Sequence, residues 1–450
     1  MITPEVSSLL RRGVAEVIVE PELVKLLESG RPLRLKQGFD PSRPDIHLGH
    51  VVGLRKLRQF QEMGHQVILI VGDWTAQIGD PSGESVTRPM LSSEEVRSNA
   101  ETYMKQFFKV VDKEKTQVRW QSEWFGKFDL SDVIKLTSKF TVAQLLARED
   151  FNKRYNAGRP IAITELLYPL LQAYDSVVIE ADVEFGGIDQ KFNCLVGREL
   201  QAMVGQPPQQ VFLVPLLVGT DGSQKMSKSL NNYVGVDEPP REIYGKVMSI
   251  PDPLIMPYFE LVTDVPDKEL EEFRQQLDSL SVNPMLLKKR LAREIVAQFH
   301  GVTAAQEAER HFEKVVQHKE VTKDFELSTQ DLKQMHLEEQ REIIRRSKER
   351  GEKPDEELRE SSLVASGWGT KPDTYSVSIA LILNNLGLAK SKGEAKRLID
   401  QGGIQIIHKD GRKATVSRDR SHIQVGDVIK VGKRRFVKIV DADKLSSADL

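Results

Sequence analysis

The alternation of apolar and polar positions predicts strands and helices in turn along the first part of the chain. Pro32 to Lys36 forms a short apolar strand, and Val51 to Met63 has apolar residues at helical spacing before a stop at Gly64. Val67 to Val71 is a continuous apolar run, typical of a parallel strand buried on both faces. This strand–helix–strand unit predicts an α/β fold with a Rossmann-like, doubly wound parallel sheet.

Other segments have less regular patterns. Helices are expected over residues 1–32, 92–112, 131–150 and 240–318. A short strand at Val118–Trp120 and the helices around it are interpreted as a connecting insertion of the domain that contains this sheet. Val177 to Phe185 is expected to be a further strand, followed by a glycine-containing turn into a helix.

The C-terminal part changes character twice. Residues 331–360 contain 18 charged residues of both signs in 30 positions, which indicates a solvated helix or a disordered tether. Thr374 to Val440 then contains 14 Lys or Arg against 5 Asp or Glu, a net charge of +9 in a chain of net charge −2. Such an island is typical of a surface that binds a phosphate backbone, although a basic solvated face is the alternative.

Composition sets broad limits. A length of 450 residues predicts two to four domains, and 39% hydrophobic with 29% charged residues is typical of a soluble globular protein. The sequence has no apolar run of membrane-spanning length and no leader-like N-terminus, and its only cysteine is Cys194. We therefore expect a cytoplasmic protein without disulfides.

The first candidate for chemistry follows the first predicted strand. Gly38 to His50 breaks at Gly38 and Pro41 and re-enters regular structure at His47-Leu48-Gly49-His50. A helix N-terminus attracts anions, and imidazoles can donate hydrogen bonds to a phosphoryl group. The stretch is interpreted as a phosphate cradle, with a metal-binding pair or a surface turn as alternatives.

A second motif lies after the apolar run Val211 to Val218. Lys225-Met226-Ser227-Lys228-Ser229 is interpreted as a mobile cationic loop, although a solvated basic turn has the same composition. Together, the two motifs resemble the paired signature of class I aminoacyl-tRNA synthetases. From about Arg11 to Lys438, apart from the charged stretch, the sequence resembles the bacterial tyrosyl enzymes of that class.

Polar residues on an otherwise apolar helix support this resemblance. Tyr168, Gln172 and Asp175 are spaced at i, i+4 and i+7, so they share one helical face. A buried aspartate needs a partner, and a phenol hydroxyl is a suitable one. Two further polar groups are Asp80, in the loop after the strand at Val67 to Val71, and Gln190, which follows two glycines. Asp80 could instead only stabilise a turn, since Asp-Pro is a common turn sequence.

The resemblance implies activation of tyrosine by ATP to tyrosyl-adenylate and pyrophosphate, then transfer to the 3′-terminal adenosine of tRNA(Tyr). The catalytic residues it implies are His47, His50, Lys225, Lys228 and Ser229. The ATP-binding residues it implies are Asp40, Ser42, His47, Gly49, His50, Lys225, Met226 and Lys228. The tyrosine-binding residues it implies are Asp80, Tyr168, Gln172, Asp175 and Gln190. Mg²⁺ is expected only as part of the ATP complex, with no prosthetic group and no protein-only metal site.

The resemblance also implies a domain order and partners. We expect a catalytic domain with its insertion at 1–235, an α-helical anticodon-side domain at 236–327, a charged linker at 328–372 and a small α+β S4-like RNA-binding domain at 373–440. The tRNA-binding residues it implies are Lys390, Lys392, Lys396, Arg397, Lys433, Arg434 and Arg435. A homodimer is expected. In one departure from the family, Lys36 stands where many tyrosyl enzymes have a tyrosine that contacts the phenol.

Three alternatives remain open at this stage. A tryptophanyl-tRNA synthetase would share the fold and both motifs, but an S4-like tail is not expected there. A cofactor-making adenylyltransferase uses the first motif in a shorter chain. A synthetase-derived RNA-binding factor would have lost its active site, against which the intact histidines and lysines argue.

Overall fold

A computed structural model describes most of the chain, in two compact units. The described residues are 4–42, 45–81, 91–314, 326–332, 334–335, 374–389, 391–432 and 435–441. The first unit is Met1–Glu309 and the second is Arg310–Leu450. We describe each unit by itself.

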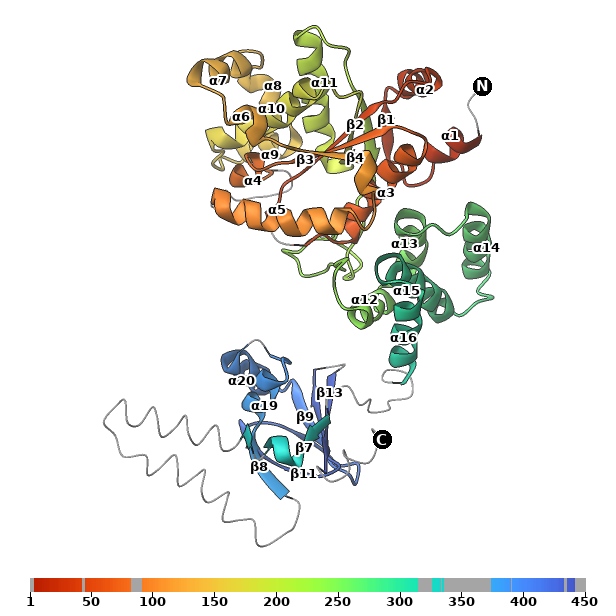
Figure 1. Cartoon of the computed structure of the whole chain (residues 1–450), viewed down its shortest axis with the longest axis vertical. Coiled ribbons are helices and arrows are strands. Elements are labelled where there is room, and N and C mark those ends of the chain that lie inside the picture. The colour runs from red at the N-terminus through yellow and green to blue at the C-terminus, as the bar shows by residue number, and fades with distance from the viewer. Residues whose placement is uncertain are drawn as a thin grey trace, which may run out of the picture. The chain divides into compact units, whose positions relative to one another are not determined.

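A six-stranded sheet forms the centre of the first unit (Figure 1). Its strands are β1 (Glu16–Ile18), β2 (Arg34–Phe39), β3 (Gln66–Val71), β4 (Thr116–Trp120), β5 (Val183–Gly187) and β6 (Gln210–Val214). They lie in the order β1-β6-β5-β2-β3-β4, and only β1 runs antiparallel to its neighbour. The chain winds outward from β2 in both directions, which confirms the predicted doubly wound sheet.

Helices cover both faces of this sheet. They are α1 (Pro4–Leu9), α2 (Glu20–Glu28), α3 (Leu48–Glu62), α4 (Thr75–Ile78), α5 (Ser93–Phe107), α6 (Ser122–Phe125), α7 (Leu130–Thr137), α8 (Val142–Leu146), α9 (Glu149–Asn156), α10 (Ile163–Val178) and α11 (Lys191–Met203). Side chains alternate along a strand, and β2 uses this to contact two helices. Lys36 hydrogen-bonds to α10, whereas the next residue, Gln37, lies against Gly53 in α3.

Three segments differ from the sequence prediction. Residues 1–32 are not all helical, because residues 16–18 form β1, which pairs with β6 at the edge of the sheet. The apolar residues from Val177 to Ile179 end the buried helix α10 instead of starting a strand, so tertiary packing overrides their β propensity. Residues 131–150 are divided between α7, α8 and the start of α9, because Thr141 caps a new helix through Gln144.

The strand predicted at Val118–Trp120 exists, but its place differs. β4 pairs in parallel with β3 over five residue pairs and forms the edge of the central sheet. It is therefore a strand of the central sheet itself and not part of an insertion. This placement brings the residues that follow it to the carboxyl end of the sheet.

The rest of the first unit is helical, as the pattern predicted for 240–318. Its helices are α12 (Pro240–Met248), α13 (Ile255–Val262), α14 (Asp267–Asp278), α15 (Pro284–His300) and α16 (Val302–Phe312). The buried residues Tyr244, Tyr258 and Phe259 give this part a core. α13 also contacts α3, so the helical part packs against the helix that begins within the first motif.

The second unit combines a helix pair with antiparallel strands. Its elements are β7 (Glu326–Ser328), β8 (Thr374–Ser378), α19 (Ile379–Asn385), α20 (Lys392–Asp400), β9 (Ile404–Ile407), β10 (Lys413–Thr415), β11 (Arg420–Gln424), β12 (Val428–Val431) and β13 (Arg435–Val440). One sheet has the order β10-β9-β12-β13-β7, and β11 pairs with β8. The core includes Ile379, Leu383, Ile404, Ile429 and Ile439.

The start of the second unit differs from the expected linker at 328–372. β7 pairs in parallel with β13, and Leu327 and Leu332 lie in the core of this unit. Residues 326–332 therefore belong to the C-terminal fold. The rest of the expected linker, residues 336–372, lies outside the described residues. Within the part of the chain that the structure describes, no helix is long and apolar enough to cross a membrane.

Candidate active site

A pocket opens where the sheet divides. β2 pairs with β3 over six residue pairs as far as Phe39, but with β5 only at Leu35↔Val183 and Lys36↔Glu184. Beyond these pairs the two strands separate and enclose a pocket of about 360 Å³. This crevice at the carboxyl ends of the strands is where doubly wound sheets bind ligands.

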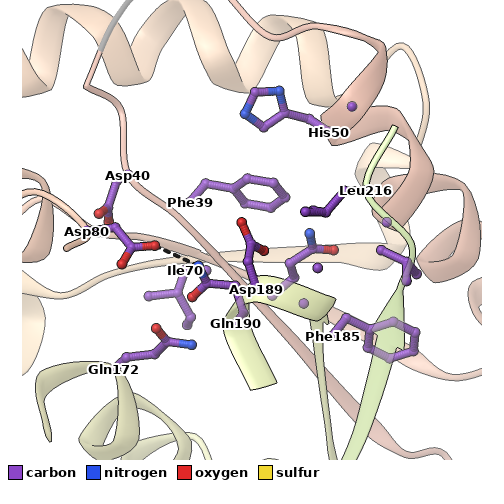
Figure 2. Close-up of a pocket in the computed structure, with 18 of the residues that line it drawn as sticks. Phe39, Asp40, His50, Ile70, Asp80, Gln172, Phe185, Asp189, Gln190 and Leu216 are labelled. Carbon is purple, nitrogen blue, oxygen red and sulfur yellow. Dashed lines mark hydrogen bonds between the residues drawn. The ribbon is translucent and has the colours of Figure 1, made fainter. Parts of the chain in front are cut away.

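Most of the predicted site residues line this pocket (Figure 2). They are Asp40, His47, Gly49, His50, Asp80, Tyr168, Gln172, Asp175, Gln190, Lys225 and Met226. Ser42, Lys228 and Ser229 are not on its wall. Segments more than 170 residues apart in the sequence therefore meet at one site.

The two histidines cap helix α3 in a reciprocal way. Gly49 N–H donates to Nδ1 of His47 at 3.1 Å, and His47 N–H donates to Nδ1 of His50 at 3.2 Å. A neutral imidazole that accepts at Nδ1 carries its proton on Nε2. The cap therefore fixes a tautomer in which both rings have Nε2–H donors available for a ligand.

Burial keeps these rings neutral. It lowers the pKa of His50 to about 4 and that of His47 well below its ordinary value, and the nearby Lys228 lowers both further. Gly49 is required between them, because a Cβ there would lie 2.9 Å from the His47 ring. The glycine thus makes room for the capping ring.

The lysines of the second motif contact protein acceptors. Lys225 Nζ lies 3.0 Å from Asp189 Oδ2, on the pocket wall. Lys228 Nζ contacts the backbone carbonyl oxygen of Asp45, and lies 4.9 Å from the centre of the Tyr103 ring. Ser229 contacts Ser227, its neighbour in the loop. Lys228 thus lies beside the loop that leads into the first motif.

The residues expected to bind the amino acid include carboxylate and amide side chains that hydrogen-bond to one another. Asp80 accepts from Gln190 Nε2 at 2.6 Å and from Arg148 at 3.3 Å. Tyr168 donates its hydroxyl to Asp40 at 2.7 Å, and burial raises the pKa of this phenol well above its ordinary value. These groups form a wall suited to an ammonium ligand.

Asp175 lines the pocket and is almost completely buried. Its carboxylate accepts from Gln121 Nε2 at 2.8 Å and from Trp124 Nε1 at 3.1 Å. Burial raises the pKa of Asp175 to about 7, although Lys36 and these hydrogen bonds oppose the shift. The carboxylate is oriented by two donors and retains lone pairs for a third.

Sequence reasoning did not identify Gln121, Trp124 or Arg148. Gln121 follows β4 directly, so assigning β4 to the central sheet would have placed it at the ligand-binding edge. Arg148 is buried, and also donates to Asn193 at 3.1 Å. Arg148 also pairs with the nearby Asp150, but its pocket partners Asp80 and Asn193 come from distant parts of the chain, so no local pattern marks it as a site residue.

The predicted tRNA-binding residues belong to the second unit. Lys392, Lys396 and Arg397 are exposed on α20. Arg435 begins β13, where the structure describes only its backbone. Lys390, Lys433 and Arg434 lie outside the described residues.

Comparisons with known proteins agree with this geometry. Residues 28–317 match the family described as tRNA synthetases class I (W and Y). A tyrosine–tRNA ligase of Dehalococcoides mccartyi is 57% identical over 97% of this chain and 98% of its own length, and one of Thermotoga maritima is 45% identical over 97% and 98%. A tyrosyl-tRNA synthetase structure from Archaeoglobus fulgidus, complexed with L-tyrosine, is 25% identical with a TM-score of 0.55, and covers 67% of this chain and 98% of its own. The chain therefore belongs to the tyrosine–tRNA ligase family of class I tRNA synthetases.

Proposed function

We propose that this chain is a cytoplasmic tyrosine–tRNA ligase whose pocket between β2 and β5 activates tyrosine with ATP. Its family catalyses the formation of tyrosyl-tRNA(Tyr), and uses ATP as a substrate. The observation that best supports this function is one pocket that joins the two histidine donors, Lys225 and the buried Asp175. The single buried cysteine, Cys194, fits a reducing compartment.

The first step needs no nucleophile from the enzyme. The tyrosine carboxylate attacks the α-phosphorus of ATP, a bond to the tyrosyl carboxylate oxygen forms, and the bond to pyrophosphate breaks. The Nε2–H groups of His47 and His50 and the N-terminus of α3 would stabilise the phosphoryl charge, and Lys225 and Lys228 the leaving pyrophosphate. Mg²⁺ would enter with ATP as part of the substrate complex.

Tyrosine would bind with its two ends at separate polar groups. The phenol hydroxyl would donate to Asp175, and the ammonium group would lie among Asp80, Gln172 and Gln190, beside Tyr168. Phenylalanine would leave the buried Asp175 without this donor, which costs free energy. Asp40, Ser42, Gly49 and Met226 are assigned to the nucleotide.

The substrate assignment predicts amino-acid-dependent exchange of pyrophosphate into ATP. The purified protein should catalyse exchange with tyrosine, but not measurably with tryptophan or phenylalanine, because only tyrosine supplies a hydroxyl to Asp175. Radiolabelled pyrophosphate measured with all three amino acids side by side tests this. Equal exchange with tryptophan would contradict the substrate but leave the superfamily intact.

The pKa of Asp175 predicts a pH dependence of tyrosine binding. With a pKa of about 7, the acceptor carboxylate is about 10% ionised at pH 6 and about 90% at pH 8. The dissociation constant for tyrosine should therefore fall about tenfold from pH 6 to pH 8. The histidines are already neutral across this range, since their pKa values are lowered. Fluorescence titrations measure the profile.

The control for this profile is Asp175→Asn, which removes the titrating group. Its tyrosine affinity should be weaker and nearly independent of pH over the same range. A flat profile in the unmodified protein would contradict the assigned role of Asp175. An unchanged profile in the variant would place the titration elsewhere, for example at Lys56, whose pKa burial lowers to about 7.

We propose that catalysis and tRNA binding belong to separate domains, in the order expected from the sequence. Residues 1–235 would form the catalytic domain and the helices after it the anticodon side, while the second unit would bind tRNA(Tyr) as an S4-like domain. The exposed basic residues of α20 support this role, together with the net charge of +9 over Thr374 to Val440. Lys390, Lys433, Arg434 and Arg435 are assigned to the same surface.

We also infer a homodimer. Large apolar side chains are exposed on α7, α8 and the first residue of α10: Leu130 at 74%, Ile134 at 57%, Val142 at 61% and Ile163 at 79%. A second copy of the chain would bury them.

Analytical ultracentrifugation should show a dimer. Ile134→Glu should raise the dissociation constant of the dimer at least tenfold. Leu286→Glu, which replaces a leucine that is 59% exposed on α15, should not.

A further inference from the structure

A buried ion pair lies beneath the pocket, outside its lining. Lys36 Nζ and Glu184 Oε1 are 2.9 Å apart, and their side chains are 0% and 1% exposed. The two residues are neighbours on β2 and β5, at the last pair before these strands separate. Because burying two charges is costly, this pair requires further hydrogen bonds to be stable.

The hydrogen bonds of the pair converge on α10. Lys36 uses all three ammonium protons, to Gln172 O at 2.7 Å, Ser176 Oγ at 2.7 Å and Glu184. Glu184 in turn accepts from Gln172 Nε2 at 3.0 Å, and from Ser176 and Gln209. Lys36 therefore holds the backbone of Gln172, while Glu184 holds its side chain.

This arrangement selects one orientation of the Gln172 amide. Its NH₂ group faces the Glu184 carboxylate, which can only accept. The reversed amide would place Oε1 against that carboxylate and lose the hydrogen bond. The amide oxygen is therefore the atom that Gln172 presents to the pocket, where Figure 2 shows it on the same side as Asp80 and Gln190.

We propose that Lys36 and Glu184 are a positioning pair, which turns the amide oxygen of Gln172 toward the α-ammonium group of the bound amino acid. The inference rests on the proposed binding of tyrosine in this pocket. It gives Lys36 a function at the ammonium end of the substrate.

The test uses variants that remove the pair without leaving one buried charge. Lys36→Met with Glu184→Met replaces both charges by apolar side chains, a change that buried pairs commonly tolerate. Lys36→Met with Glu184→Gln keeps an acceptor for Gln172 Nε2 and serves as the conservative control. Thermal unfolding and circular dichroism check that both are folded.

The measurement is the dissociation constant of two ligands by fluorescence titration. These are tyrosine and 3-(4-hydroxyphenyl)propanoate, which is tyrosine without its amino group. The double-methionine variant should bind tyrosine about tenfold more weakly and the desamino compound within twofold of the unmodified protein. The glutamine control can accept from Gln172 Nε2 but can also donate to Gln172 Oε1, so it should recover only part of the lost tyrosine affinity. In a Gln172→Ala background, the double-methionine change should add no further loss.

Several results would overturn the inference. Tyrosine affinity within twofold in the double-methionine variant would show that the pair does not position Gln172. An equal loss for both ligands would assign it a structural role only. An unchanged affinity in Gln172→Ala would overturn the inference together with the role of Gln172. By contrast, absence of tyrosine-dependent exchange in the unmodified protein would overturn the proposed function itself.

Discussion

Lys228→Ala should slow formation of tyrosyl-adenylate by two to three orders of magnitude, and leave the KM for tyrosine within about twofold. Lys228 lies at Asp45 and Tyr103, away from the residues assigned to tyrosine. As negative charge moves onto the departing pyrophosphate, a cation that engages it stabilises the transition state more than the ground state. The loss should therefore appear in kcat and not in substrate binding.

Single-turnover formation of the adenylate, followed by rapid quench, measures this effect directly. Lys268→Ala is the matched control, because Lys268 is exposed on α14 and lies in a helix without assigned catalytic residues. It should leave both rate and KM unchanged. If Lys228→Ala forms adenylate at the unmodified rate, the loop takes no part in catalysis. If its KM for tyrosine rises while kcat is kept, the lysine serves binding only.

The sheet could be predicted where one strand is buried on both faces. Val67 to Val71 identified β3 because all five positions are apolar, and the turn residues after them placed its end. The edge strands were harder: β1 has three partly buried residues, and nothing local shows that it pairs with β6. At Val177, packing of α10 decided the structure against the residue's own β preference.

The site could be predicted where it rests on local motifs. His47 and His50 lie three residues apart, so their shared cap on α3 follows from local spacing. The neighbours of Asp175 could not be predicted in this way, since Gln121 comes from the end of an edge strand. Lys36 was recognised only as a departure from the family. Its partner Glu184 is 148 residues away, and only the pairing of β2 with β5 brings them together.

A chain that ends at Lys314 should retain tyrosine-dependent pyrophosphate exchange within about twofold, and lose about a hundredfold in kcat/KM for charging of tRNA. The cut follows α16 and removes the strands and helices from β7 to β13 together, which a cut at residue 371 would not do, because β7 pairs with β13. The two units have separate cores, so the pocket in the first should remain intact. Only contacts with the phosphate backbone should be lost.

Salt dependence separates this explanation from a general loss of structure. Each phosphate contact that is removed lowers the slope of log affinity against log salt by about one. The charging efficiency of the full chain should fall steeply with salt and that of the truncated chain less, so their difference should be largest at low salt. Replacing Lys392, Lys396 and Arg397 together by alanine should give an intermediate slope with normal exchange.

Loss of exchange on truncation would show that the second unit is needed for the folding of the catalytic unit. If both exchange and tRNA charging survive truncation, the basic surface of the second unit does not bind tRNA and is only a solvated face.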